Sequence, residues 1–198
     1  MKEVSIEELY AAADEAREDI WDAAKAYGRD PKIYLHWSAG HYFQKFSDYH
    51  VNITADGKIY LTTNFSVKLP HTYMRNSGAV GISLCCAAGA DTHDLGDEPP
   101  TAEQIEAMAQ TILAVSQGLW LTIDKDHVLT HGEAADNEDG LDVHEMYGPR
   151  TTCERWDLEY LGTDESSSFN PWADDGSRGG DVLRGKANWY LNQLKGKE

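Results

Sequence analysis

The sequence predicts an α/β fold in which a single domain is built on a central mixed β-sheet flanked by helices. Short apolar runs bounded by turn residues alternate with longer stretches of helical periodicity, a pattern typical of interleaved strands and helices. The 198 residues, 41% of them hydrophobic, suffice for one packed core. No internal repeat suggests a second domain, so we expect an N-terminal helix at 1–28, a core at 32–161, and a loop and C-terminal helix at 163–198.

The N-terminal segment predicts a long helix. Ser5 followed by Glu8 resembles a capping box, in which each side chain bonds the backbone N–H of the other residue. Small and aliphatic residues then recur at helical spacing until Gly28 ends the pattern. The residues expected to face the core are Leu9, Ala12, Ala13, Ala16, Ile20 and Ala24.

Strands are predicted in three segments of the first half. Residues 32–38 (KIYLHWS) are expected to form a buried strand that runs into a loop, with His36 near the end of the strand. The Asp56-Gly57 pair lies between two runs of alternating apolar residues, which is a strong hairpin signal. Residues 79–86 (AVGISLCC) predict a central strand.

The second half predicts two helices and one more strand. Thr101 and Gln104 give capping-box chemistry at the start of a helix with a clear apolar face. Residues 127–133 (HVLTHGE) predict a short strand whose end carries His131. Asp181 is expected to cap the last helix. The inward-facing residues of that helix would be Leu183, Ala187, Leu191 and Leu194.

The formal net charge of −17 argues against nucleic-acid binding, because phosphate contacts depend on clustered Lys and Arg. We interpret the acidic run from Asp136 to Asp142 as a solvated segment that favours solubility. No apolar stretch approaches the roughly 18 residues of a membrane helix, and the N-terminus is acidic and amphipathic. We therefore expect a protein made in the cytoplasm without a signal peptide and without membrane insertion.

Two of the eight histidines stand out as candidate ligands. His36 and His131 each follow an apolar strand run and precede small or polar residues, the position where ligands collect at a sheet edge. Spacing alone leaves two readings open, a shared metal ion or two hydrogen-bonded core residues. The histidines expected on the surface are His41, His93, His127 and His144.

Six short motifs in a fixed order extend this reading. They are LHWS, DYHVNITADGKIY, HTYMRNSGAVGISL, PPTAEQ, LTHGE and RWDLEYL. In this order they resemble the zinc N-acetylmuramoyl-L-alanine amidases of the peptidoglycan-recognition-protein and phage-lysozyme type, the amidase-2 family. The resemblance runs from about Lys32 to Leu161, and it implies the fold of that family.

The resemblance implies a zinc site made by His36, His131 and Asp157. Two imidazoles and one carboxylate leave the fourth tetrahedral position open for water, the arrangement expected of catalytic rather than structural zinc. Cys153 is a rival third ligand, since thiolate binds zinc well, but it lacks the basic residue that precedes Asp157 by two positions. The cysteines otherwise indicate neither a disulfide framework nor a metal knuckle.

Catalytic roles follow from the same resemblance. Tyr49 matches a tyrosine beside the zinc that would orient or deprotonate the water; the alternative is a hairpin aromatic with its hydroxyl in solvent. Arg155 stands where relatives usually carry lysine and would face the oxyanion, unless it forms a surface ion pair. Ser83 stands where many recycling relatives carry a glutamate base, which favours the lytic branch or a base elsewhere, with Glu133 the nearest candidate.

Substrate contacts are implied for the loop residues His71, Thr72 and Asn76, which would bind the muramyl lactyl group and the first stem residues. Trp37 or Tyr42 could stack on a sugar face. The expected activity is hydrolysis of the amide between N-acetylmuramic acid and L-alanine of peptidoglycan. The alternatives are a peptidoglycan-binding module without turnover and a cytosolic muropeptide-recycling amidase. We expect a monomeric phage or prophage endolysin that reaches the wall through a holin or an injection system.

Overall fold

The computed structural model describes residues 1–90, 95–143, 157–159, 161 and 178–196. Within them, the strands are β1 (Lys2–Glu3), β2 (Lys32–Trp37), β3 (Val51–Ile53), β4 (Ile59–Leu61), β5 (Ala79–Leu84) and β6 (Val128–Thr130). The helices are α1 (Ile6–Lys25), α2 (Ala102–Leu119), α3 (His131–Ala135) and α4 (Gly179–Lys195).

The strands form one mixed sheet in the order β1-β4-β3-β5-β2-β6. The strands β3, β5, β2 and β6 run parallel. At one edge β4 pairs antiparallel with β3, and β1 pairs antiparallel with β4. Every residue of β2 and β5 is buried, as expected of parallel strands that are covered on both faces. The predicted mixed sheet flanked by helices is therefore confirmed.

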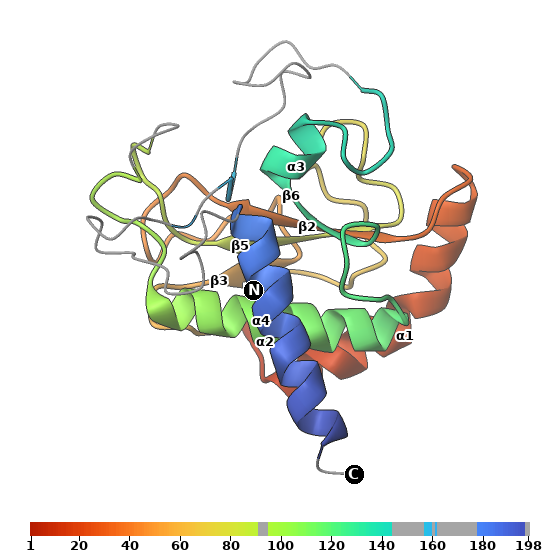
Figure 1. Ribbon diagram of the computed structural model, residues 1–198, viewed down its shortest axis with the longest axis horizontal. Coiled ribbons are helices and arrows are strands. Elements are labelled where there is room, and N and C mark those ends of the chain that lie inside the picture. The colour runs from red at the N-terminus through yellow and green to blue at the C-terminus, as the bar shows by residue number, and fades with distance from the viewer. Residues whose placement is uncertain (91–94, 144–156, 160, 162–177, 197–198) are drawn as a thin grey trace.

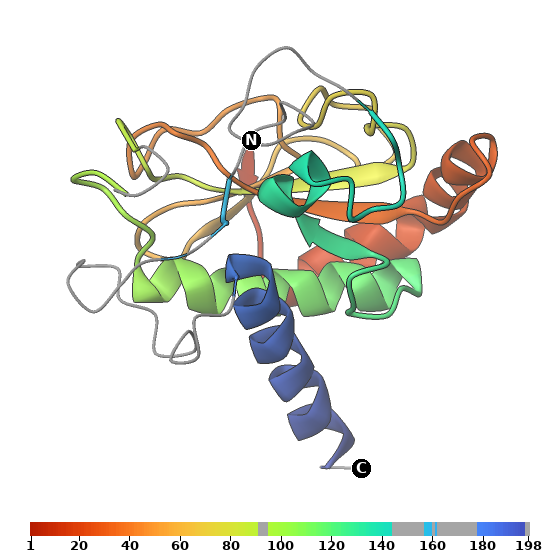
Figure 2. The same ribbon diagram turned by 45° about the horizontal axis from the view of Figure 1, so that its top comes forward.

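Two long helices cover one face of the sheet. In both views α1 and α2 run along that face, and α4 crosses α2 and projects away from the rest of the molecule (Figures 1 and 2). The crossing of α1 and α2 is close at Gly118, where an added Cβ atom would lie 2.6 Å from the Cβ of Ala13. The other side of the sheet carries α3 and the loops that form the candidate site.

Local sequence signals place most of these elements correctly. The capping boxes predicted from Ser5 with Glu8 and from Thr101 with Gln104 are both formed. The hairpin of β3 and β4 turns at Gly57, whose φ of +76° is the left-handed conformation that favours glycine. Each of these signals lies within a few residues of the structure that it specifies.

Three expectations for the second half are wrong. The strand at 127–133 ends at Thr130, because a capping box between Thr130 and Glu133 starts α3 at His131. The last helix begins at Gly179 with Arg178 as its N-cap, whereas Asp181 lies in the first turn. Leu194 is 48% exposed, because α4 leaves the body of the molecule before its last turns.

The acidic run is also less solvated than expected. Asp139 is buried and accepts hydrogen bonds from the Nε of Arg75 at 2.6 Å and from the hydroxyl of Tyr34 at 2.7 Å. Asp136 and Glu138 both form ion pairs with Arg178. These charges therefore tie the segment after α3 to the loop that contains Arg75 and to the start of α4.

Among the described helices, none combines the length and the apolar character that crossing a membrane requires.

Candidate metal site

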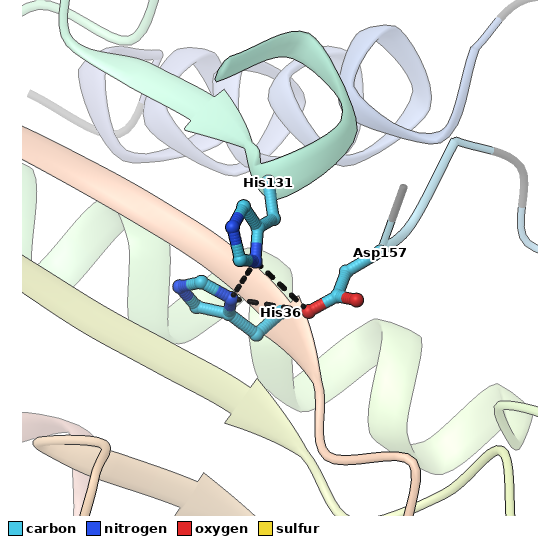
Figure 3. Close-up of side chains that lie close together, drawn as sticks. All are labelled: His36, His131 and Asp157. Carbon is cyan, nitrogen blue, oxygen red and sulfur yellow. Dashed lines mark hydrogen bonds and ion pairs between the residues drawn. The ribbon is translucent and has the colours of Figure 1, made fainter. Parts of the chain in front are cut away.

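Three buried side chains meet at the carboxyl ends of β2 and β6. His36 comes from β2, His131 is the first residue of α3, and Asp157 lies in a turn on the other side (Figure 3). The Nδ1 atoms of the two histidines are 3.1 Å apart. The Oδ2 atom of Asp157 lies 3.2 Å from Nδ1 of His36 and 3.3 Å from Nδ1 of His131. The three donor atoms thus form a nearly equilateral triangle.

Hydrogen bonds alone explain this triangle poorly. If both imidazoles donate to Asp157, their two N–H groups face each other across 3.1 Å without attraction. A central cation attracts all three atoms at once. Ligand atoms about 2.0–2.1 Å from a tetrahedral zinc ion lie about 3.3–3.4 Å apart, close to the observed 3.1, 3.2 and 3.3 Å. The group therefore fits a metal ion of the size and geometry of zinc.

Strand register brings the two histidines together. Because β2 and β6 pair in parallel with Leu35 opposite Thr130, the residues that follow them in the chain, His36 in β2 and His131 at the start of α3, meet at the same sheet edge. The backbone N–H of Gly132 donates to the carbonyl of Asp157 at 3.1 Å, which fastens the third side chain to α3. The following residue, Leu158, has a φ of +58°, so the chain turns sharply there.

The loop predicted to bind substrate supports His36 from behind. The hydroxyl of Thr72 lies 3.3 Å from Nε2 of His36 and 3.0 Å from Nδ1 of His71. Asn76 accepts a hydrogen bond from the backbone N–H of Thr72 at 2.8 Å. His71 is 6% and Thr72 1% exposed. This placement favours an outer support that orients His36 over direct contact with a glycopeptide.

Neutral histidines pack around this support. Burial, followed by the charges of His36, His50 and His131, holds the pKa of His71 well below its ordinary value. Gly81 is required beneath it, because an added Cβ atom would lie 2.6 Å from the His71 ring. At neutral pH His71 is therefore uncharged, so it does not repel a cation at the triangle.

His50 was not singled out by its sequence context, yet it belongs to the same cluster. Its Nδ1 accepts from the backbone N–H of Gly81 at 3.0 Å, and its Nε2 lies 2.7 Å from the carbonyl of Val67. These partners specify a neutral ring with the proton on Nε2. Burial lowers the pKa of His50 to about 4. The one sequence signal at this histidine is its place in the motif DYHVNITADGKIY, next to Tyr49, and that motif alone did not assign it a role.

The aromatic residues separate into two groups. The ring of Tyr49 lies 5.0 Å from the ring of His36, and Tyr49 is 6% exposed, so it stands beside the triangle of candidate ligands. Trp37 is 3% exposed and belongs to the hydrophobic core. Tyr42 donates its hydroxyl hydrogen to the carbonyl of Pro99. The placement of Trp37 gives no support to stacking on a sugar.

The remaining candidates occupy different places. Ser83 is buried opposite His36 in the sheet register, but a serine at neutral pH cannot replace a carboxylate base. The carboxylate of Glu133 accepts from Arg184 and from the backbone N–H of Thr130, so it is engaged in structure rather than facing a water. Arg155 and Cys153 lie outside the described residues.

Comparison with known proteins gives one family and several similar folds. The family model described as N-acetylmuramoyl-L-alanine amidase matches residues 12–155, which include both histidines and end before Asp157. No curated protein matches the chain.

Solved structures similar to this chain include the endolysin amidase LysCS from Clostridium intestinale, at 18% identity and a TM-score of 0.41, covering 54% of this chain and 72% of that one. Drosophila PGRP-LB is similar at 17% identity and a TM-score of 0.42, with 73% and 86% covered. The Ph2119 endolysin of a Thermus scotoductus bacteriophage is similar at 17% identity and a TM-score of 0.37, with 54% and 74% covered.

Proposed function

Because this chain belongs to the N-acetylmuramoyl-L-alanine amidase family, we propose that it is a zinc-dependent hydrolase of peptidoglycan. The bond cleaved is the amide between N-acetylmuramic acid and L-alanine of the stem peptide. The observation that carries the proposal is the triangle of His36, His131 and Asp157, three buried side chains whose donor atoms are 3.1–3.3 Å apart. Its spacing and its two-nitrogen, one-oxygen composition match catalytic zinc.

The protein side of the chemistry rests on the residues around the triangle. Bound zinc would supply Lewis-acid polarisation of the scissile carbonyl and acidify a water. His36 and His131 would hold the ion through their Nδ1 atoms, which lie 3.1 Å apart. The Thr72 hydroxyl, 3.3 Å from Nε2 of His36, could then accept the Nε2 proton and so select the tautomer that a metal ligand needs. Asp157 would contribute the negative charge that balances part of the charge of the ion.

Two further residues complete the proposal. Tyr49 lies beside His36, where its hydroxyl would orient the attacking water or take its proton. Arg155 would stabilise the oxyanion of the tetrahedral intermediate, since a guanidinium stays charged and can donate two parallel hydrogen bonds. It is a poor proton donor, so the leaving amine would receive its proton from another group.

We favour a lytic amidase over a muropeptide-recycling amidase. Ser83 occupies the register position opposite His36, and it leaves this position without a carboxylate base. A monomeric phage or prophage-type lysin, released to the wall after synthesis in the cytoplasm, is the form of the proposal that we favour. A soluble anhydro-muropeptide is the competing substrate.

The deciding experiment incubates the purified protein with peptidoglycan, with and without a chelator, and identifies the new ends by mass spectrometry. We expect free stem peptides that begin with L-alanine, intact glycan chains, loss of cleavage with chelator, and recovery with added zinc. Peptidoglycan binding without cleavage would instead indicate a recognition module. Cleavage only of soluble anhydro-muropeptides would indicate recycling, and chelator-resistant cleavage would overturn the zinc mechanism.

A further inference from the structure

A buried ion pair joins α4 to the helix that begins with His131. The guanidinium of Arg184 donates to both carboxylate oxygens of Glu133, each at 2.7 Å. Arg184 also donates to the carbonyl of Val128 at 2.8 Å and to Asp181 at 2.7 Å. One side chain of α4 therefore holds the last strand, β6, and the following helix, α3, in a fixed relation.

The helix α3 depends on such external contacts. It has five residues, far fewer than the roughly 12–15 that an isolated helix needs to be even marginally stable in water. Its start is fixed by the capping box, in which Glu133 accepts from the backbone N–H of Thr130 and Thr130 accepts from that of Glu133. His131 lies inside this box. The Glu133 carboxylate that closes the capping box is the same carboxylate that accepts hydrogen bonds from Arg184.

Two adjacent glycines allow α4 to come this close. A Cβ atom added at Gly180 would lie 2.6 Å from both carboxylate oxygens of Glu133. A Cβ atom at Gly179 would lie 2.2 Å from the carbonyl oxygen of Leu158, next to Asp157. The backbone N–H of Gly179 also donates to the carbonyl of Glu159 at 2.9 Å. The start of α4 thus contacts both α3, which carries His131, and the turn that carries Asp157.

We propose that Arg184 is a positioning residue for the metal site, acting on His131 through Glu133. The proposal rests on the proposed function, because it assumes that His131 binds zinc. Arg184 is not one of the three candidate ligands; it fixes the direction from which His131 presents Nδ1. Outer partners of this kind typically change metal affinity or activity by about 10–100-fold.

The test uses a double variant, Glu133→Gln with Arg184→Met. Removing one partner alone would leave an unpaired buried charge and could unfold the protein. The double variant removes both charges, and glutamine still closes the capping box. We expect a folded protein whose zinc affinity, measured by competition with a chelating dye, is about 10–100-fold lower. At saturating zinc, kcat should fall while KM for a muropeptide is unchanged.

A second variant, Gly180→Ala, approaches the same contact from the other side. The added methyl group displaces the Glu133 carboxylate without removing a charge, so zinc affinity should fall here too. This variant decides the question if the double variant does not fold.

Lys186→Met provides the matched control. Lys186 lies on the same helix and forms an ion pair with Glu106 of α2 at 2.6 Å, away from α3. Its loss should leave zinc affinity unchanged whatever it does to stability. If wild-type zinc affinity and both kinetic constants persist in the double variant and in Gly180→Ala, Arg184 has no positioning role. If the wild-type protein itself binds no zinc, the proposed function fails first.

Discussion

Asp157 is the donor in the triangle that the family match does not reach, because the match ends at residue 155. Its assignment rests on geometry, since Oδ2 lies within 3.3 Å of both histidine nitrogens. Cys153 was its rival from sequence and lies outside the described residues. The two assignments differ in a measurable way.

The Asp157→Ala variant should lose both stoichiometric zinc and amidase activity, because two imidazoles alone bind zinc weakly. Cys153→Ala serves as the matched control and should keep both. Metal content by atomic absorption, after dialysis against a weak chelator, is the measurement. Zinc retained in Asp157→Ala and lost in Cys153→Ala would transfer the third position to the cysteine.

Tyr49 is expected to act on the water and not on the metal. The Tyr49→Phe variant keeps the ring that packs against His36 and removes only the hydroxyl. We expect zinc content to be unchanged and kcat to fall by about 10²–10⁴-fold, the usual contribution of a positioned acid or base. Undiminished kcat would remove Tyr49 from the mechanism.

His50 predicts a specific dependence of stability on pH. Its pKa in the folded protein is about 4, below the ordinary value of 6.5, so the unfolded chain takes up the proton first as pH falls. The stability that neutral His50 contributes is complete above about pH 6.5 and is lost progressively toward pH 4. Each pH unit within this range should remove up to about 1.4 kcal/mol.

Denaturant unfolding of the wild type and of His50→Gln, both without zinc, measures this effect. The other titrating groups are common to the two proteins, so the difference between their free energies of unfolding isolates His50. That difference should shrink as the pH is lowered from 7 to 4.5. A difference that is constant over this range would contradict the neutral, buried state of the ring.

At the scale of elements, the crossing of α1 and α2 depends on a missing side chain. Gly118→Ala should destabilise the protein by about 1–3 kcal/mol, the usual cost of overpacking, because its Cβ would clash with Ala13 and with the carbonyl of Tyr10. The control is Gly185→Ala in α4, where a Cβ meets nothing within 4 Å. That change should stabilise the protein by up to about 1 kcal/mol through helix propensity. Thermal unfolding that ranks the two variants the other way would show that the helices do not cross closely at Gly118.

Which helices, strands and turns could be predicted from the sequence depends on how local their signals are. The starts of α1 and α2 and the turn at Gly57 were predictable, because each depends on residues within one turn of the chain. The pairing of β1 with β4 joins Lys2 to Leu61, and neither partner carries a signal for the other. The ion pair of Arg75 with Asp139 was missed for the same reason, since each lies in a polar loop of ordinary composition.

In the candidate site, too, features that depend on neighbouring residues in the chain were predictable, and contacts between distant residues were not. His36 and His131 were found because they end apolar runs, and their meeting follows from parallel strand order. The support by Thr72 and the burial of Trp37 were not foreseen, because a motif gives the identity of neighbours in the chain but not which of them faces inward. The ion pair between Arg184 and Glu133 joins residues 51 positions apart, so no local pattern in the sequence indicates it.

For the whole molecule, the metal should act as a stabilising ligand. If zinc binds the folded triangle as proposed and not the dispersed ligands of the unfolded chain, free zinc at 100 times its dissociation constant should add about 2.7 kcal/mol. Differential scanning calorimetry with zinc and with chelator should therefore give a higher Tm with zinc. The shift should vanish in Asp157→Ala, and an equal shift there would indicate binding elsewhere on this acidic chain.

The positions of the three donors in the chain set the order of events in biosynthesis. His36 is separated from His131 by 95 residues and from Asp157 by 121. A ribosome must therefore release nearly the whole domain before the complete ligand set exists, and loops of this length close late and slowly. If the three residues bind zinc as proposed, metal capture by the full set is a late step in maturation, and an incompletely folded chain would carry no working catalytic centre inside the cell that makes it.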